Sequence, residues 1–312
     1  MKLGFLYAGQ GSQHPGMGAD LYDAFPTFRQ VFDQAANCVD FDLKELCFEG
    51  PESQLSQTRY TQPCMVAYAI GVTDLLAREG ICPQAAAGLS LGEYSALYAA
   101  GVLDRDTAIQ TVALRGRAME EAAAGLDCGM TAVLGLDREK LQQACDQASD
   151  LGVVQICNYN CPGQLVIGGE KEAVDQAGVL AKELGAKRCM PLKVSGPFHT
   201  KLMKPAGDAL KAHFKTITFG EMKLPVYFNC LGATKGKASI PALLERQVQS
   251  SVYWEDTIRR MEADGIDTVV EIGPGKTLSA FFKKTAPGIK MYNIDTVEDF
   301  RAVAAALKGE TQ

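Results

Sequence analysis

The sequence predicts an α/β fold in which a main domain with a parallel sheet is interrupted by a smaller domain. Strand-turn-helix patterns occur around residues 86–100 and again around 267–284, and such alternation is typical of parallel sheets. Between them, the apolar pattern gives the order β-α-β-β-α-β, which is that of a ferredoxin-like unit. We therefore expect a main domain made of 1–125 and 196–312, with a ferredoxin-like subdomain at 126–195.

The composition is that of a soluble globular protein. The chain has 312 residues, of which 47% are hydrophobic, enough for a packed core. A formal charge of −6 argues against nucleic acid as the main ligand. Apolar runs such as 65–72 are too short to span a membrane, and Met1–Tyr7 is predicted to be a strand and not a signal peptide. We expect no nucleic-acid and no membrane partner.

The cysteines give no sign of a metal site or a disulfide framework. Ten cysteines are scattered along the chain without a C-x-x-C pair, and only three histidines accompany them. A chain of this length does not need disulfides to fold. We therefore expect reduced thiols, no bound metal and a cytoplasmic location.

The N-terminal third is predicted to begin with a buried strand and a glycine-rich loop. The loop does not have the spacing of a dinucleotide fingerprint, and both a tight surface turn and a close approach to a ligand fit it. The elements expected here are a strand over 3–7, the loop 8–16 and helices over 26–36, 43–47 and 63–79, the last starting near Thr61 and Pro63.

The stretch Gly88-Leu89-Ser90-Leu91-Gly92 has the G-x-S-x-G pattern of a nucleophile elbow. Small apolar residues precede it, and residues 93–100 have helix-forming composition. The two glycines allow a tight turn that exposes the Ser90 hydroxyl beside the first amides of the helix. This context favours Ser90 as a nucleophile. The alternative is a glycine-rich turn with a serine facing solvent.

A helix capped by Asp104 and running to about Ala124 places Arg115 in an apolar stripe. Residues 108, 112, 115 and 119 follow helical spacing and form this stripe. A buried arginine needs a partner, because an unpaired buried charge is costly. A bound carboxylate would serve, but periodicity alone favours an ion pair with an acid of the protein itself.

His199 lies where the inserted unit returns the chain to the main domain, a natural position for a cleft. An imidazole can accept a serine proton and return it to a leaving group, although a lone histidine is more often structural. The inserted unit is expected to contain strands over 130–134, 153–158, 164–167 and 188–194, with helices over 138–148 and 170–184.

Beyond His199, a helix with four lysines precedes a second strand-turn-helix unit over 267–284. The lysines fit one face, which is either an ordinary solvated surface or a docking patch. Gly-Pro-Gly-Lys-Thr at 273–277 lacks the earlier glycine of a phosphate-binding P-loop.

Together, these motifs resemble the malonyl-CoA:acyl carrier protein transacylases, an acyltransferase family of fatty acid synthesis. The resemblance spans nearly the whole chain and implies an α/β-hydrolase-like larger domain interrupted by the ferredoxin-like one. It rests on the order and spacing of Gly9-Gln10-Gly11-Ser12-Gln13, the segment 88–95, Arg115-Gly116, Pro197-Phe198-His199, Gln247 and the segment 271–275.

The resemblance also implies a role for each matching residue. In this family scheme, Ser90 is the nucleophile, His199 the general base and acid, the backbone amides of Gln10 and Leu91 form the oxyanion hole, Gln247 orients the histidine through its carbonyl, Arg115 binds the malonyl carboxylate, and Phe198 restricts the acyl group. Two positions depart from the common pattern: Leu89 replaces a frequent histidine, and Ser251 a frequent proline.

The implied activity is ping-pong transfer of malonyl from malonyl-CoA to the phosphopantetheine thiol of acyl carrier protein, through a malonyl-serine intermediate and without a cofactor. The alternatives are a discrete acyltransferase of a polyketide synthase, a serine thioesterase or hydrolase, and a catalytically silent scaffold. Because carrier protein is acidic, we expect it to dock on a basic patch made of Lys187, Arg188, Lys201, Lys204, Lys211 and Lys215.

Overall fold

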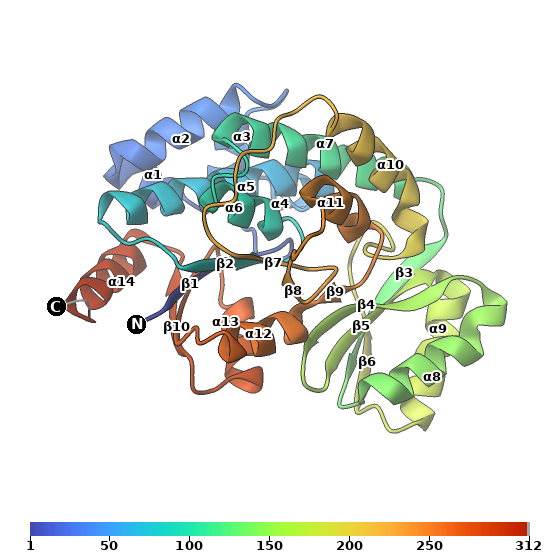
Figure 1. Ribbon diagram of the computed structural model, residues 1–312. Coiled ribbons are helices and arrows are strands. Elements are labelled where there is room, and N and C mark those ends of the chain that lie inside the picture. Colours follow the sequence, from blue (N-terminus) through green and yellow to red (C-terminus); the bar gives the residue numbers. More distant parts are fainter. Residues whose placement is uncertain (311–312) are drawn as a thin grey trace.

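The computed structural model describes residues 1–310 and contains two β-sheets (Figure 1). The larger sheet has six strands in the order β11-β10-β1-β2-β7-β8, parallel except for the β7–β8 pair. Its strands are β1 (Leu3–Tyr7), β2 (Ala85–Gly88), β7 (Val226–Phe228), β8 (Ala233–Thr234), β10 (Thr268–Ile272) and β11 (Lys290–Ile294).

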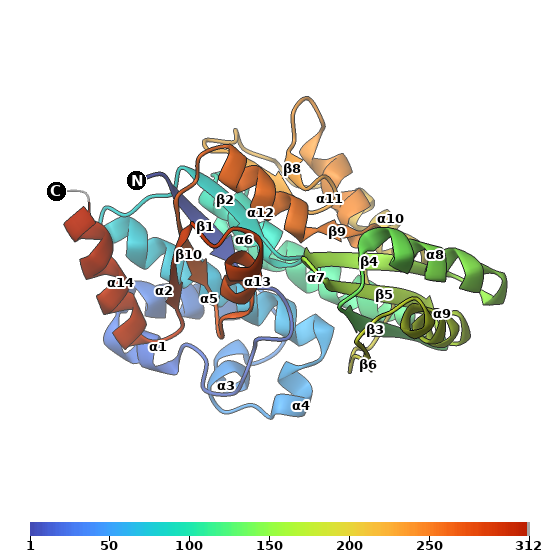
Figure 2. The same ribbon diagram turned by 90° about the horizontal axis from the view of Figure 1, so that it is seen from below.

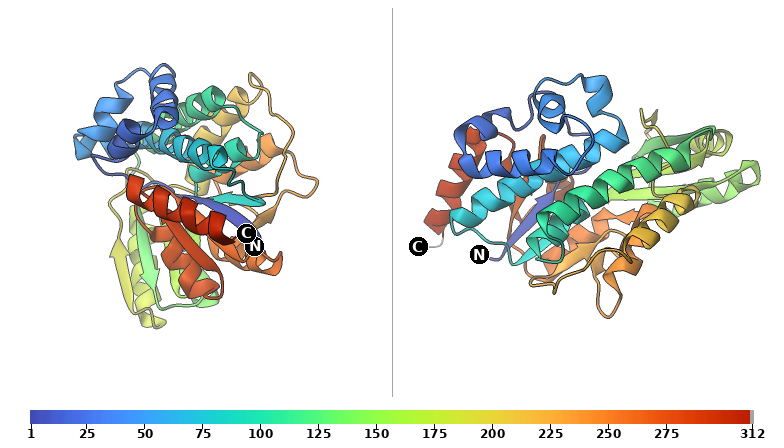
Figure 3. Two further views of the ribbon diagram at one scale, coloured as in Figure 1. Left: turned by 90° about the vertical axis from the view of Figure 1, so that its left-hand side faces the viewer. Right: turned by 90° about the horizontal axis from the view of Figure 1, so that it is seen from above.

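Helices cover both faces of this sheet (Figures 1 and 3). Strands β1 and β10 are buried throughout, as expected for a parallel sheet between two helical layers. Phe5 and Tyr7 pack on one side, whereas Leu6 between them packs on the other. The first layer holds α2 (Pro26–Ala36), α5 (Thr58–Arg78), α6 (Gly92–Ala99) and α7 (Arg105–Ala123); the second holds α12 (Trp254–Ala263) and α13 (Thr277–Thr285).

The other helices pack around these layers. Helix α14 lies at the end of the molecule away from the small sheet (Figure 2). The helices that pack around the two layers are α1 (Ala19–Ala24), α3 (Leu43–Phe48), α4 (Glu52–Leu55), α10 (Lys204–His213), α11 (Ile240–Val248) and α14 (Val297–Glu310). Short 3₁₀ turns lie at Ser149–Leu151 and Lys201–Met203. Across residues 1–310, none of the helices has the length and apolar character needed to cross a membrane.

The smaller sheet has the strand order β6-β3-β5-β4-β9. Its first four strands form antiparallel pairs and alternate with helices in the order β-α-β-β-α-β. Strand β9 comes from the later part of the chain and pairs in parallel with β4. The elements are β3 (Cys128–Leu134), α8 (Arg138–Ala148), β4 (Val154–Cys161), β5 (Gln164–Glu170), α9 (Lys171–Glu183), β6 (Arg188–Pro191) and β9 (Val252–Tyr253).

The α/β class is confirmed, and several element boundaries differ from the prediction. Helix α5 begins at Thr58, so Pro63 lies inside it and does not start it. Residues 61–73 are all buried, and this packing outweighs the loss of one backbone hydrogen bond at the proline. The division at 125/126 and 195/196 stays a prediction, and its last residues, 311 and 312, lie outside the described part.

The close packing around β2 gives a stability prediction. A Cβ atom on Gly88 would lie 2.0 Å from both the carbonyl carbon and the carbonyl oxygen of Gly92, which are backbone atoms and cannot rotate away. We expect Gly88→Ala to lower the free energy of unfolding by more than about 3 kcal/mol.

Gly178→Ala is the matched control, because a Cβ there meets no atom within 4 Å and lies in helix α9. It should raise stability by about 0.5 kcal/mol or more. Urea unfolding of both variants measures the difference. Equal stability of Gly88→Ala and the wild type would show that the elbow tolerates a side chain.

Candidate active site

Ser90 lies in a sharp turn between strand β2 and helix α6. Its φ of 53° is in the left-handed region, which non-glycine residues seldom adopt. The glycines on either side explain the turn: a Cβ on Gly88 would collide with Gly92, and one on Gly92 would lie 2.3 Å from the carbonyl oxygen of Tyr7. The elbow therefore packs directly against strand β1.

His199 contacts Ser90 in the geometry of a nucleophile and its base. The Ser90 Oγ to His199 Nε2 distance is 2.8 Å, and His199 Nδ1 lies 2.9 Å from the carbonyl oxygen of Gln247. Because a carbonyl only accepts hydrogen bonds, Nδ1 carries the proton and Nε2 is free to accept one. Among non-glycine residues of the described chain, only Ser90 and His199 have positive φ, a kind of strain that gathers at functional sites.

The environment of His199 keeps its imidazole neutral. The residue is 4% exposed, and burial, followed by the charge of Arg115, lowers the pKa of its imidazole from 6.5 to about 4. At neutral pH nearly every molecule therefore has a histidine that can accept the Ser90 proton.

Arg115 lies beneath Ser90 and is completely buried. Its guanidinium donates to Ser90 Oγ (3.0 Å), Gln62 Oε1 (2.8 Å) and Gln247 Oε1 (3.0 Å), all uncharged acceptors. No carboxylate in residues 1–310 lies within ion-pair distance of it. Burial lowers the pKa of Arg115, because the guanidinium has lost its contact with water and no carboxylate lies close enough to form an ion pair with it.

The nearest acid, Glu93, does not supply that anion. Its side chain is fully buried, and burial raises its pKa to about 8. At neutral pH this carboxyl is therefore mostly protonated. Helical periodicity alone favours an ion pair between Arg115 and an acid of the protein. Among the described residues, no carboxylate lies within ion-pair distance of Arg115.

Two glutamines complete the site. The side chain of Gln247 donates from Nε2 to the Ser90 carbonyl (2.8 Å) and accepts from Arg115, in addition to its backbone contact with His199. Gln62, which the sequence analysis did not single out, is also a partner of Arg115. The available signal was a long polar side chain directly before the apolar run over 63–72.

A cavity of about 230 Å³ opens at Ser90 and His199. It lies between the two sheets, since Asn158 and Asn160 of β4 line it together with the elbow. The ring of Phe198 forms part of its wall; a Cβ on Gly196 would lie 2.9 Å from that ring. The full lining is Gly9, Gln10, Leu89, Ser90, Met119, Met130, Asn158, Asn160, Val166, Leu192, Val194, Phe198, His199, Thr277 and Phe281.

The glycine-rich loop packs against the elbow beside this cavity. A Cβ on Gly9 would lie 2.9 Å from the Leu89 carbonyl oxygen, so only glycine allows the approach. This contact brings Gln10 to the cavity wall. The amide N–H groups of Gln10 and Leu91, the predicted oxyanion donors, have no acceptor in the described chain.

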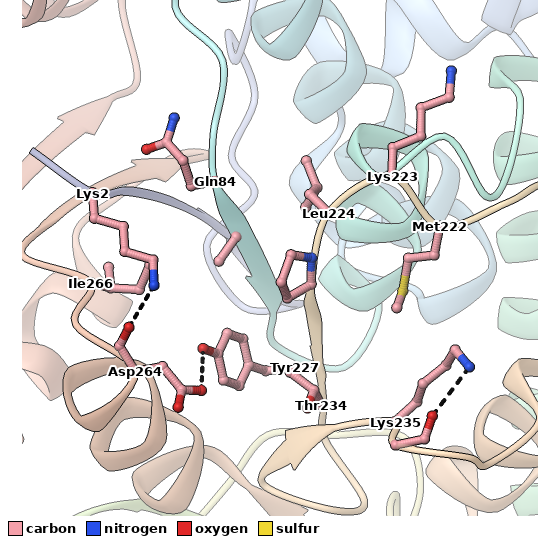
Figure 4. A pocket seen from close by; sticks show the side chains of 13 residues that line it. Lys2, Gln84, Met222, Lys223, Leu224, Tyr227, Thr234, Lys235, Asp264 and Ile266 are labelled. Carbon is pink, nitrogen blue, oxygen red and sulfur yellow. Dashed lines mark hydrogen bonds between the residues drawn. The ribbon is translucent and has the colours of Figure 1, made fainter.

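A larger cavity, about 700 Å³, lies at the opposite, amino-terminal ends of β1, β2 and β7 (Figure 4). Some of its polar groups bond to one another: Tyr227 donates to Asp264 Oδ2 (2.8 Å), and Lys2 Nζ donates to the Asp264 carbonyl (2.6 Å). It contains no nucleophile paired with a base. Ligands of parallel α/β sheets bind at the carboxyl ends of the strands, where the smaller cavity lies.

Ion pairs engage part of the predicted basic patch. Lys204 contacts Asp208 (2.6 Å), and Lys211 contacts Glu245 (3.1 Å). Lys215 lies beyond the end of α10. The patch stays a prediction.

The described residues contain no group of three or more His, Cys, Asp or Glu side chains arranged to hold a metal ion.

Comparison with known proteins assigns the family. Residues 4–303 match the acyl transferase domain family, and the chain belongs to it. The chain is 42% identical over 311 residues to the malonyl CoA-acyl carrier protein transacylase of Bacillus subtilis, covering 99% of this chain and 98% of that one.

Two solved structures are similar over almost their whole length. The crystal structure of MCAT from Streptococcus pneumoniae has a TM-score of 0.94 and 44% identity, covering 98% of this chain and 100% of that chain. A type II PKS acyl-carrier protein in complex with its malonyl-transacylase matches with a TM-score of 0.94 and 37% identity, covering 98% of this chain and 100% of that chain.

The lowered pKa of His199 predicts how Ser90 reactivity depends on pH. The rate of covalent labelling by a fluorophosphonate should stay constant through neutral pH and fall in acid with a midpoint near 4, because only neutral His199 accepts the proton. Arg115→Gln should raise this midpoint, but burial, the larger cause, should keep it below 6.5.

Fluorescence of the buried Trp254 provides the folding control for this experiment. Unfolded chains bind a proton at His199 more readily than the native state does, so native stability also decreases as pH falls from 6.5 toward 4. A labelling midpoint at or above 6.5 in folded protein would contradict the lowered pKa of His199.

Proposed function

We propose that this protein transfers a malonyl group from malonyl-CoA to the phosphopantetheine thiol of acyl carrier protein, the malonyl-loading step of fatty acid synthesis. The single observation that carries the proposal is the buried Arg115, which donates to Ser90 Oγ and has no anionic partner among the described residues. An acyl group that carries its own carboxylate supplies the missing charge. The names of the curated relatives agree with this substrate.

The first half-reaction is attack by Ser90. His199 Nε2 takes the proton from Oγ as that oxygen attacks the malonyl thioester carbon. The negative charge moves to the former carbonyl oxygen, which the free amides of Gln10 and Leu91 stabilise. Collapse of this intermediate breaks the carbon–sulfur bond, and His199 returns the proton to coenzyme A.

The second half-reaction reverses these steps with a different thiol. The phosphopantetheine thiol gives its proton to His199 and attacks the malonyl-serine ester, and Ser90 leaves with the proton back on Oγ. All bonds and protons balance without a redox or metal cofactor. Malonyl-CoA and carrier protein are the two substrates.

Arg115 also supports transfer over hydrolysis. The guanidinium still has N–H groups to offer, since Arg115 Nε has no hydrogen-bond partner among the described residues. The malonyl carboxylate can therefore accept from Arg115 without displacing Ser90 Oγ. The acyl group is then held at its far end inside a cavity of about 230 Å³, which leaves little room for water.

The pathway has two candidates. A polyketide carrier protein is the partner in one solved relative, so a polyketide synthase acyltransferase remains the second candidate. The chemistry at Ser90 is the same for both. Offering fatty acid and polyketide carrier proteins separately with malonyl-CoA separates them, and the higher kcat/KM identifies the pathway.

We also place this activity in the cytoplasm. All ten cysteines are free, which suits a reducing compartment.

The proposed role of Arg115 predicts a change in substrate choice. Arg115→Ala should reduce kcat/KM for malonyl-CoA by about 100-fold or more, because a charge-assisted bidentate contact with the carboxylate is lost. Acetyl-CoA has no such carboxylate and should lose far less. Steady-state transfer to carrier protein with each donor measures the ratio. Equal losses for the two donors would contradict carboxylate binding by Arg115.

The thioesterase alternative has its own test. Wild-type protein with malonyl-CoA and carrier protein should form malonyl-carrier protein much faster than free malonate. Faster release of malonate than of malonyl-carrier protein would identify a hydrolase instead.

A further inference from the structure

Asn229 is a fully buried residue that follows strand β7 and contacts the elbow from the side. Its Oδ1 accepts a hydrogen bond from the backbone N–H of Ser90 (2.6 Å), and its Nδ2 donates to the carbonyl of Gly88 (2.7 Å). One side chain therefore holds the backbone on both sides of Leu89.

These contacts continue the β2–β7 ladder beyond its last backbone pair. The ladder pairs Ala86 with Val226 and Ala87 with Tyr227, and then β2 turns away into the elbow. A primary amide carries one acceptor and two donors, so it can replace the peptide group that the ladder lacks. No carboxylate or aliphatic side chain offers both functions.

The backbone of Asn229 is fixed as well. Its N–H donates to Glu93 Oε2 (2.6 Å), and its carbonyl accepts from the N–H of Tyr253 (2.8 Å). Glu93 lies in the first turn of α6, the helix that the elbow opens, and Tyr253 belongs to β9. The amide of Asn229 is thus held in place from two directions.

The two backbone groups of Ser90 have separate partners. Asn229 binds its N–H, and Gln247 Nε2 donates to its carbonyl (2.8 Å). Between these contacts the residue keeps a φ of 53°, a conformation that costs about 1–3 kcal/mol unless its surroundings enforce it. This conformation directs Oγ toward His199 Nε2.

We propose that Asn229 is a positioning residue for the acyl-transfer reaction: its side-chain amide holds Ser90 in the left-handed conformation that aligns Oγ with His199. The inference rests on the proposed nucleophilic role of Ser90. Asn229 is proposed to make no contact with the substrate. Replacing Asn229 should therefore slow the chemical step and leave substrate binding unchanged.

The test compares Asn229→Leu, which has similar volume and neither hydrogen bond, with Asn229→Asp, which keeps the acceptor for Ser90. Asn229→Leu should lower kcat by about 100-fold with malonyl-CoA and acetyl-CoA alike, because a small misplacement of the nucleophile has this effect. The KM for malonyl-CoA should stay within about twofold of wild type. Asn229→Asp should lie between Leu and wild type.

Val226→Ala is the matched control for destabilisation, because Val226 is fully buried in strand β7, which directly precedes Asn229, and has no hydrogen bond to Ser90. It should lower the Tm without lowering kcat. A folded Asn229→Leu protein with kcat within threefold of wild type overturns the inference. The inference is also overturned if Asn229→Leu changes only KM, or if Val226→Ala with the same Tm shows an equal loss of kcat. If Asn229→Leu does not fold, Asn229→Asp alone must show the loss of kcat.

Fluorophosphonate labelling of Ser90 separates failure of this inference from failure of the proposed function. Labelling should slow in Asn229→Leu in parallel with kcat, and it needs neither malonyl-CoA nor carrier protein. Slow labelling together with a wild-type protein that transfers no malonyl would refute the function and support the positioning role. Wild-type labelling rates in the variant would refute the positioning role alone.

Discussion

The structure depends on a steric constraint at the end of strand β2. Neither Gly88 nor Gly92 has room for a side chain, because the backbone of the elbow and of β1 occupies that space. The chain must therefore reverse direction at Ser90, whose backbone is left-handed. The residues around the elbow hold Ser90 from different sides: Asn229 at the backbone N–H, Gln247 at the carbonyl, and His199 and Arg115 at the hydroxyl.

Electrostatics then give the site its preference. Burial removes water from a cation, a base and a carboxyl that lie close together. Burial lowers the pKa of Arg115 and of His199 and raises that of Glu93, and each of these shifts favours the uncharged form of the group. A site that is short of negative charge favours a substrate with its own carboxylate. The same lack of charge keeps the histidine neutral, as a general base must be before attack.

The sequence predicted the parts of the site that depend on local patterns. The elbow is a local pattern, so residues 88–92 predicted both the turn and the exposed hydroxyl. Helical spacing placed Arg115 in the apolar stripe, but it could not tell whether the partner was a protein acid or a ligand. Gln62, Asn229 and the side-chain role of Gln247 were not predicted. Their side chains form hydrogen bonds with residues 53, 139 and 157 positions away in the sequence, and only tertiary folding brings these groups together. Strand β9, with two residues, was too short to give a periodic signal.

Peptide mass spectrometry after brief exposure to malonyl-CoA tests whether Ser90 carries the malonyl group. We expect a malonyl ester on the peptide that contains Ser90, with fragment ions placing it on that residue. The ester should disappear when carrier protein with its phosphopantetheine arm is added, and malonyl-carrier protein should appear in equal amount. A malonyl group on another residue, or transfer to carrier protein by a Ser90→Ala variant, would contradict the role of Ser90 as the nucleophile.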